Sequence, residues 1–378
     1  MSLHPDYQND FGPFEGRIWL NSASEGAMPK VAAEATQEAI AWKLRPYHLT
    51  QKRFSEVPWQ MKKAIGELIH KPPEEVILAN STSYGIHLLA NGFPFQTGDE
   101  ILLMQNDFPT NILPWLALKQ RGVIVRQLMP RGCVLQPEEI QGNITPATKL
   151  LCLVHVHTFT GHIVDLEKIG NICREKGIVF VVNLSQTLGT IPVNLDELPV
   201  DAVTSAGFKW LCGPYGTGFC WMRPKWLNQL KLNHVYWGRM LSAKALEDTG
   251  PLSLPEDQSA RCYDVFGTAN FFNFVPWRVA VEYLLGIGIE RILEHNLQLV
   301  DQLIQGLDAK SYLLISPRER QKRSTLVVFS HPINEKNREI YERLRNQGIY
   351  LALWKGNLRA APHIFNTEED IDRLLAAL

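Results

Sequence analysis

The chain has 378 residues, of which 45% are hydrophobic, and a formal net charge of −1. A charge this close to zero argues against nucleic acid or an anionic membrane surface as the main partner, and no apolar run is long enough to cross a bilayer. The first residues do not resemble a secretory signal, and the six cysteines show no Cys-x-x-Cys spacing, so we expect a cytoplasmic protein with reduced thiols.

Short apolar runs of strand length alternate with helical patterns through the first two-thirds of the chain. This alternation predicts an α/β fold with three layers, in which helices cover both faces of a mostly parallel sheet. The predicted strands lie at 76–79, 100–104, 123–128, 149–156, 178–182 and 201–205, and the predicted helices begin near 82, 112 and 166.

A different order of elements follows a looser, polar stretch in the last third of the chain. Two helices come first, then two strands and a final helix, which predicts a smaller α+β domain. These elements lie at 276–285, 291–307, 326–330 and 349–353 and from Thr367. Because the length exceeds what one domain usually holds, we predict a large domain over 15–262 and a small domain over 263–378 together with 1–14.

The segment at 80–85 joins a predicted strand to a predicted helix and is rich in hydroxyl groups. Ser81, Thr82 and Ser83 lie where the first turn of the helix leaves backbone N–H groups available as donors. An ordinary N-cap explains this composition, and so does a phosphate-binding site. Both interpretations are open from the residues alone.

Two histidines close the predicted strand at 149–156. Alternate residues of a strand face the same side, so His155 and His157 could hold a metal ion. No third cysteine, histidine or carboxylate follows at a suitable spacing, and we therefore expect no metal site.

Lys209 follows the last predicted strand of the large domain. It lies in a loop that Gly213, Pro214 and Gly216 turn back on itself. In open α/β sheets, ligands bind in the crevice at the carboxyl ends of the strands. A lysine that loses its charge through burial becomes a nucleophile for carbonyl groups. The pattern therefore indicates a candidate catalytic lysine.

The stretch around Lys209 resembles the lysine region of the fold-type I pyridoxal-phosphate enzymes. The similarity is to the class V aminotransferase branch, which includes cysteine desulfurases, kynureninase and isopenicillin N epimerase, and the segment FKWLCGPYGTGF is closest to the epimerase-like members. The matching residues are Asn183-Leu184-Ser185-Gln186, Phe208-Lys209, Gly213-Pro214-Tyr215-Gly216, Gly267-Thr268 and the segments 107–115 and 359–370. The resemblance extends from Trp19 to Ile371.

The resemblance implies a pyridoxal-phosphate enzyme that acts on an amino acid by transamination, epimerisation or elimination. Lys209 would form a Schiff base with the cofactor and shuttle the α-proton, and Arg359 would hold the substrate α-carboxylate in its fork of donors. Thr268 would reach the phosphate bound by the other subunit, which implies a homodimer. The other implied cofactor-binding residues are Ser81, Thr82 and Ser83 at the phosphate, Phe108 stacked on the ring, Thr158 at the cofactor edge, Asn183 at the pyridine nitrogen and Gln186 at the 3′-oxygen.

Several positions depart from the family pattern. Asn183 replaces the aspartate that keeps the pyridine nitrogen protonated, Phe208 replaces a histidine, and Ala206 replaces a phosphate-binding serine. Because a neutral amide supplies no charge, we expect a weaker electron sink, which disfavours full transamination relative to racemisation, epimerisation or elimination. The segment 340–358 holds no cysteine, and a persulfide-forming desulfurase needs one, so we expect a different reaction.

Two other functions compete with the amino-acid enzyme. One is a catalytically idle descendant that keeps the dimeric fold and binds a metabolite or a protein. The other is an enzyme acting on a sugar or another substrate that is not an amino acid. The retained Lys209, Gln186 and Arg359 favour the enzyme acting on amino acids. We expect the loops at 21–27, 43–54 and 237–265 to set its side-chain specificity.

Overall fold

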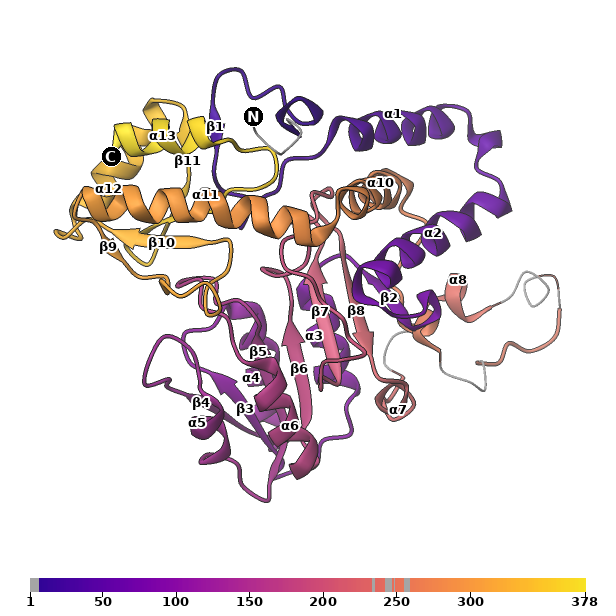
Figure 1. Ribbon diagram of the computed structural model, residues 1–378. Coiled ribbons are helices and arrows are strands. Elements are labelled where there is room, and N and C mark those ends of the chain that lie inside the picture. The colour runs from indigo at the N-terminus through magenta and orange to yellow at the C-terminus, as the bar shows by residue number, and fades with distance from the viewer. Residues whose placement is uncertain (1–6, 233–234, 242–246, 248, 255–258) are drawn as a thin grey trace.

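The computed structural model describes residues 7–232, 235–241, 247, 249–254 and 259–378, with a seven-stranded sheet at its centre (Figure 1). The order along the sheet is β2-β8-β7-β6-β5-β3-β4, and within this sheet only β8 runs antiparallel to its neighbours. The predicted mostly parallel sheet is therefore confirmed, and β8 is a strand that the sequence did not predict. The strands are β2 (Val76–Ala79), β3 (Glu100–Met104), β4 (Ile124–Leu128), β5 (Thr148–Val154), β6 (Val179–Asn183), β7 (Ala202–Ala206) and β8 (Gly218–Met222).

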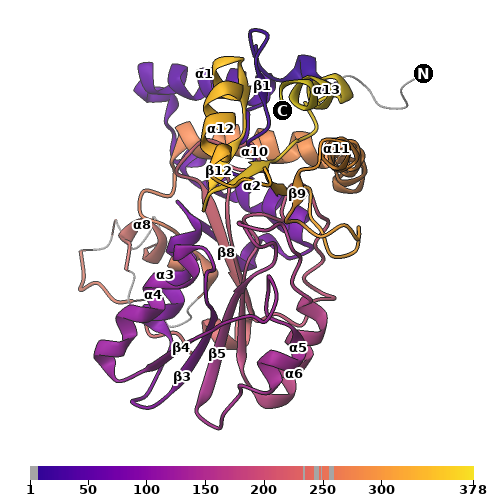
Figure 2. The ribbon, with the colours of Figure 1, turned by 90° about the vertical axis from the view of Figure 1, so that its left-hand side faces the viewer.

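Helices cover both faces of this sheet, as Figure 2 shows. One face carries α3 (Thr82–Gly92) and α4 (Leu113–Leu116), and the other carries α2 (Gln51–Ile69), α5 (Pro137–Gln141), α6 (Leu166–Lys176) and α10 (Phe271–Ile287). Successive residues of β6 alternate between the two faces. Val179 and Val181 belong to the core beneath α3 and α4, whereas Phe180 and Val182 belong to the core beneath α2, α6 and α10. A strand that is apolar on both sides is typical of a sheet buried between two helical layers. The three-layer α/β fold is confirmed.

A second, smaller unit follows α10 in the chain. Its sheet has the order β12-β13-β10-β9, and all neighbouring strands are antiparallel. A separate short pair joins β1 and β11 in parallel. The elements of this unit are β1 (Ile18–Trp19), α11 (Ile289–Ala309), β9 (Leu313–Leu314), β10 (Val327–Ser330), α12 (Lys336–Asn346), β11 (Ile349–Tyr350), β12 (Ala352–Trp354), β13 (Asn357–Ala360) and α13 (Glu368–Ala377).

The division into two domains stays a prediction, and the packing favours a shift of its boundary. Buried residues of α10 belong to the core of the large sheet, whereas Ile18 and Leu20 belong to the core of the small unit. A boundary between α10 and α11 fits this packing better than one after residue 262. The N-terminal strand then counts with the small unit although it precedes the large one in sequence.

The sequence did not predict the helices that precede β2. The first, α1 (Lys30–Leu44), packs on α10, which also packs on α2 (Figure 1). Two further short helices, α7 (Pro224–Leu227) and α8 (Trp237–Met240), follow β8. The expected specificity loop at 237–265 is described only in part, since 242–246, 248 and 255–258 lie outside the described residues.

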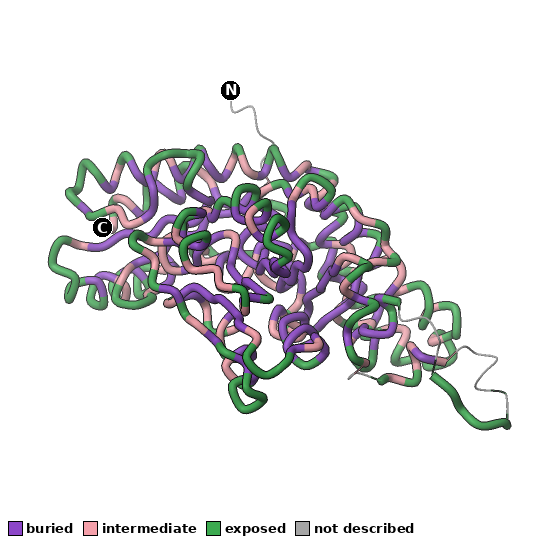
Figure 3. The backbone as a smooth tube through the Cα atoms, turned by 90° about the horizontal axis from the view of Figure 1, so that it is seen from below, coloured by how far each residue is buried: buried purple, intermediate pink, exposed green. Residues whose placement is uncertain are grey.

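Burial follows the layers. Seen from below in Figure 3, buried backbone gathers in the centre and exposed backbone marks the outer turns. Within the described part of the chain, no helix is both long and apolar enough to span a bilayer.

Candidate active site

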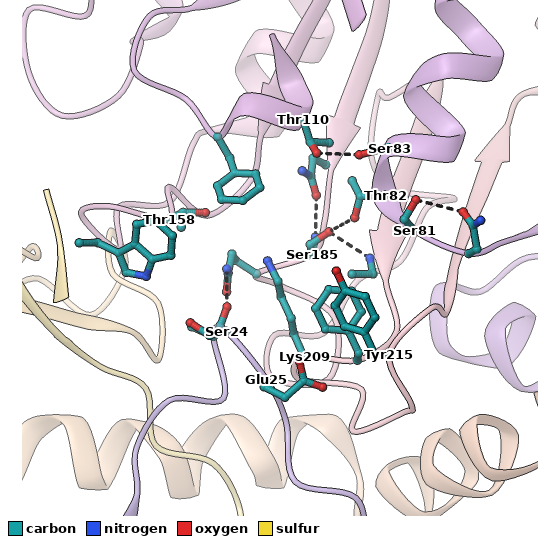
Figure 4. Close-up of a pocket in the computed structure, with 18 of the residues that line it drawn as sticks. Ser24, Glu25, Ser81, Thr82, Ser83, Thr110, Thr158, Ser185, Lys209 and Tyr215 are labelled. Carbon is teal, nitrogen blue, oxygen red and sulfur yellow. Dashed lines mark hydrogen bonds between the residues drawn. The ribbon is translucent and has the colours of Figure 1, made fainter. Parts of the chain in front are cut away.

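A cleft of about 320 Å³ lies where the carboxyl ends of the parallel strands meet the small unit (Figure 4). Its volume falls in the range of roughly 300–1,000 Å³ that is typical of small-molecule sites. Ligand sites in open α/β sheets lie at this edge. The cleft brings together all the predicted site residues except Thr268, namely Ser81, Thr82, Ser83, Phe108, Thr158, Asn183, Gln186, Lys209 and Arg359.

Lys209 lies in the connection between β7 and β8, and this connection is fixed by close backbone contacts. The Gly26 N–H donates to the Phe208 carbonyl at 2.8 Å, and the Cys212 N–H donates to the Lys209 carbonyl at 3.0 Å. A Cβ at Gly26 would lie 1.8 Å from the Lys209 carbonyl oxygen, so only glycine permits this approach. The N-terminal loop and the lysine loop are therefore held against each other.

The environment of Lys209 favours a neutral amine. Burial, with a smaller contribution from the positive charge of Arg359, lowers the pKa of Lys209 to about 8, and the carboxylate of Glu25 opposes this shift. The Lys209 Nζ lies 5.3 Å from the centre of the Phe108 ring. Roughly a tenth of the amine is then unprotonated at pH 7, far more than for an ordinary lysine, and this neutral form can act as a nucleophile.

Hydroxyl groups line one end of the cleft. The Ser81 Oγ accepts the Tyr84 N–H at 3.3 Å, so Ser81 is the N-cap of α3 and also lines the cleft. The Thr82 Oγ1 lies 2.6 Å from the Ser185 Oγ, which accepts the Ala206 N–H at 3.0 Å. The N-terminus of a helix with hydroxyls around it suits an anion such as phosphate. Both interpretations of the 80–85 segment therefore fit the same residues.

Ser185 is a cleft residue for which the sequence indicates no role. It places a hydroxyl against the backbone of Ala206, the position where the family pattern has a serine. Its place two residues beyond the end of β6 is the signal that could have identified it, because residues just past the carboxyl end of a parallel strand face the ligand crevice. The Ser185 hydroxyl therefore lies beside the position where the family pattern has a serine.

Asn183 belongs to a chain of hydrogen bonds that runs behind the cleft. Its Oδ1 accepts the Ser185 N–H at 2.9 Å, and its Nδ2 donates to the Asn111 Oδ1 at 2.9 Å. The Asn111 Nδ2 in turn donates to the Asp107 Oδ2 at 3.0 Å. Burial raises the pKa of Asp107 to about 6, although hydrogen bonds from Asn111 and from two backbone N–H groups oppose the shift. A neutral amide held in one orientation therefore occupies the position where the family has an aspartate.

Gln186 is fixed at both ends of its amide. Its Oε1 accepts the Trp210 Nε1–H at 2.8 Å, and its Nε2 donates to the Ala23 carbonyl at 2.9 Å. The amide lines the cleft in one orientation, with the nitrogen as its donor. Its role at the cofactor 3′-oxygen stays a prediction.

Arg359 lies on β13 at the opposite end of the cleft and is only 1% exposed. One guanidinium nitrogen, Nη2, donates to the Ser24 Oγ at 2.6 Å and the Asn21 Oδ1 at 3.4 Å, and Nη1 donates to the Thr158 carbonyl at 3.3 Å. Its Nε has no hydrogen-bond partner, and no carboxylate among the described residues forms a salt bridge with it. Burial lowers the pKa of Arg359 to about 10. A buried cation with unused donors indicates a site for an anionic ligand.

Phe108 and Trp354 line the cleft, and both rings lie near Phe159, which is not one of the lining residues. The ring centres of Phe108 and Phe159 lie 6.4 Å apart, and those of Phe159 and Trp354 lie 6.0 Å apart. The sequence alone does not identify Trp354 as a site residue. A lone aromatic residue in a sequence is more often part of the core, and only the pairing of β12 with β13 places Trp354 here.

Thr268 does not line this cleft within the single chain. Its hydroxyl donates to the Val265 carbonyl, and its own carbonyl accepts from Arg239. Its predicted contact with a phosphate held by the other subunit stays a prediction.

Among the described residues, no histidine or cysteine lines the cleft. His155 and His157 form hydrogen bonds with Thr187 and Thr160, and among the described residues no group of three or more histidine, cysteine or acidic side chains is arranged to hold a metal. All six cysteines are free, and none lines the cleft. Cys212, the cysteine nearest to Lys209 in sequence, is completely buried.

The residues of the cleft fit pyridoxal phosphate. A neutral amine can bond to an aldehyde, the hydroxyls at the N-terminus of α3 can bind the phosphate, and the face of Phe108 can stack on a ring. The unused donors of Arg359 remain available for the carboxylate of a substrate.

Comparisons with known proteins agree with this arrangement. The family model described as Aminotransferase class-V matches residues 18–374. A probable cysteine desulfurase of Methanothermobacter thermautotrophicus is 25% identical, with 98% of this chain and 96% of the relative covered. The isopenicillin N epimerase of Streptomyces clavuligerus is 24% identical, with 95% of this chain and 93% of the relative covered.

Solved structures share the fold. A mutant of the enzyme C-DES with glycine covalently linked to its PLP cofactor has a TM-score of 0.90 at 22% identity, over 99% of this chain and 98% of that one. The same enzyme, described as a cystine C–S lyase, was solved with its reaction product cysteine persulfide, at a TM-score of 0.87 and 23% identity, over 97% of this chain and 98% of that one. An apo cysteine desulfurase from Thermococcus onnurineus has a TM-score of 0.87 at 22% identity, over 100% of this chain and 97% of that one.

Proposed function

Because the chain belongs to the aminotransferase class V family and is a pyridoxal-phosphate-dependent enzyme, we propose that it changes bonds at the α-carbon of an amino acid in the cleft at Lys209. One observation carries the proposal. Arg359 is buried without a carboxylate partner among the described residues and faces the same cleft as an amine with a lowered pKa. An amino acid supplies the two groups that this pair lacks, an α-carboxylate for the arginine and an α-carbon proton for the amine.

The residues of the chain divide the work along the cleft. When bound, pyridoxal phosphate supplies an aldehyde that bonds to amines and a ring that withdraws electrons from the substrate α-carbon. Ser81, Thr82 and Ser185 would hold its phosphate. The Lys209 Nζ would hold the cofactor through its aldehyde, and the same amine would be the base that accepts the substrate α-proton and the acid that returns it. Arg359 would orient the substrate so that the bond to be broken faces that amine.

Asn183 supports racemisation, epimerisation or elimination over full transamination. A carboxylate at this place would raise the pKa of the cofactor ring nitrogen by roughly one to three units. This corresponds to about 1.4–4 kcal/mol of added stability for the protonated ring, which is the form that withdraws electrons most strongly. The amide of Asn183 is neutral, and its orientation is fixed by the Ser185 N–H and by Asn111. Reactions that need a long-lived store of negative charge on the cofactor are slowed most.

The lack of a cysteine at the cleft supports a reaction without a persulfide on the protein. A desulfurase that stores sulfur on its own cysteine needs that thiol beside the substrate, and none of the six cysteines lines the cleft. The chain shares its fold with the C–S lyase C-DES, which was solved with its product cysteine persulfide. This likeness is compatible with an elimination in which the substrate's sulfur leaves with the product. The six free thiols also support our placement of the protein in the cytoplasm.

We further propose that the active form is a homodimer. Tyr215 lines the cleft and yet is 74% exposed, and its ring lies 4.6 Å from that of Phe208. Phe266 and Phe272 are also exposed and lie near Thr268 in the chain. A second subunit that covered these rings would complete the wall of the cleft. Light scattering should then give a mass of twice 42.9 kDa, and a mass of 42.9 kDa at micromolar concentration would contradict the dimer.

The function is tested first by spectroscopy. Purified protein incubated with pyridoxal phosphate should absorb in the visible range, and borohydride reduction followed by peptide mapping should place the modification on Lys209. A Lys209→Ala variant is the control. Amino acids are then screened for a change in this absorption. A protein that stays colourless with added cofactor, or an adduct on another lysine, would overturn the proposal.

A further inference from the structure

The two ends of the cleft differ in chemistry. Hydroxyls of Ser81, Thr82 and Ser185 surround the end at α3, whereas Phe108 and Trp354 line the way to Arg359. Figure 4 shows Ser81, Thr82 and Ser83 on one side of Lys209 and Ser24 and Thr158, which accept hydrogen bonds from Arg359, on the other. A ligand that placed its anionic phosphate at the first end would leave the aromatic end to the substrate.

The pairing of β12 with β13 places Trp354 on the same side of the sheet as Arg359. Ala352 pairs directly with Arg359, and Trp354 lies two residues further along β12, so all three side chains point to the same face. The Arg359 Cζ accordingly lies 6.0 Å from the centre of the Trp354 ring. An amino acid whose carboxylate is bound by Arg359 therefore has this ring within reach of its side chain.

The turn after Trp354 is tightly held. Lys355 and Gly356 both have positive φ, at 49° and 79°, which is the geometry of a two-residue hairpin turn. The Gly356 carbonyl accepts from the Asn337 Nδ2 at 2.8 Å, and the Lys355 Nζ lies 4.0 Å from the centre of the Phe159 ring. The hairpin thus contacts both α12 and Phe159, and it cannot move without breaking these contacts.

Trp354 is nevertheless 42% exposed, although it lines the cleft. An indole that is held in place and left open can bury further apolar surface only when a ligand covers it. Among the described residues, Lys209 and Arg359 are the only cationic side chains that line the cleft, and each already has a role. An acidic substrate side chain would therefore find no further cation in the described cleft lining.

We propose that Trp354 is a specificity-determining residue and that the substrate is an α-amino acid with a bulky apolar, preferably aromatic, side chain. The proposal rests on the proposed function, in which Arg359 holds the α-carboxylate. The indole packs against the substrate side chain, beyond the Phe108 ring that would stack on the cofactor. A side chain as small as that of alanine leaves the indole uncovered.

The test uses two acids that lack an amine and so bind without reacting. Dissociation constants of 3-phenylpropionate and propionate are measured on the cofactor-loaded enzyme from the shift in cofactor absorption and by calorimetry. The wild type should bind 3-phenylpropionate at least about tenfold more tightly, the ratio that 1.4 kcal/mol of aromatic packing produces. Trp354→Ala should bring the ratio close to one, and Trp354→Phe should retain most of it.

Two controls separate the possible failures. Leu313→Ala removes an exposed apolar side chain from the other edge of the same sheet and should leave the ratio unchanged. Arg359→Lys should weaken both acids together. If Arg359→Lys changes neither affinity, the proposed function fails. If it weakens both acids but the wild type does not distinguish them, or Trp354→Ala preserves the ratio, the proposal for Trp354 is wrong and the proposed function stands.

Discussion

Replacing Asn183 by aspartate is expected to destabilise the fold, because the hydrogen bonds behind the cleft have a fixed direction. The Ser185 N–H can only donate and the ionised Asp107 can only accept, so the two amides between them are locked in one orientation. With aspartate at 183, a carboxylate oxygen faces the Asn111 Oδ1, and both atoms are acceptors. Turning the Asn111 amide over merely moves the conflict to Asp107.

The expected loss is that of one buried polar contact, roughly 1–3 kcal/mol of unfolding free energy. Protonated Asp107 becomes a donor and removes the conflict. Because burial already raises the pKa of Asp107 to about 6, the fold favours its protonated form, and the stability that this carboxyl contributes is lost as the pH rises through the folded pKa. The substitution raises that pKa further. Its full cost should therefore appear at pH 8 and shrink at pH 5.

The assay is urea unfolding of the cofactor-free protein, followed by circular dichroism at pH 5 and pH 8. Asn228→Asp, at an exposed asparagine, is the matched control for the added charge. The reasoning is refuted if Asn183→Asp is as stable as this control at pH 8, or if its deficit is equal at both values of pH.

Further measurements address the cleft itself. The rate of cofactor attachment to Lys209 should rise with pH around a midpoint near 8, since the amine must lose its proton. Glu25→Gln should lower that midpoint, because the carboxylate raises the pKa of the lysine. A midpoint near 10 in the wild type would contradict the argument that burial lowers the pKa of Lys209. Arg359→Lys keeps a charge but loses the fork of donors, so the dissociation constant for the amino acid should rise at least about tenfold in absorbance titrations while cofactor stays bound. Ser185→Ala should weaken cofactor binding about tenfold in equilibrium dialysis, since it removes a hydroxyl beside Thr82, and unchanged affinity would exclude it from the phosphate site.

The sequence predicted the framework of the fold and one end of the site well. Apolar runs of strand length marked β3 and β6, because strands buried on both faces have no polar alternation to obscure them. It missed β8, whose five residues follow a glycine-rich turn and run against the direction of the neighbouring strands. Hydrophobic periodicity carries no information on strand direction.

Lys209 and Arg359 were predictable because each lies in a contiguous motif. Trp354 and Asn111 were not, for two different physical reasons. The place of Trp354 depends on the register of β12 against β13, which is fixed by the two-residue turn between them. The role of Asn111 depends on a hydrogen bond to Asn183, a residue 72 positions away. Long-range pairing of this kind leaves no local pattern in the chain.

The N-terminal strand has a practical consequence for anyone who shortens this protein. Residues at the start of a chain are commonly trimmed as dispensable when a protein is prepared for expression. Here β1 pairs with β11, and the few residues after it supply Asn21 and Ser24, which hold the guanidinium of Arg359. Removal of residues 1–25 would therefore delete the acceptors of two of the three hydrogen bonds that hold the Arg359 guanidinium, although none of the seven strands of the large sheet lies in the deleted segment.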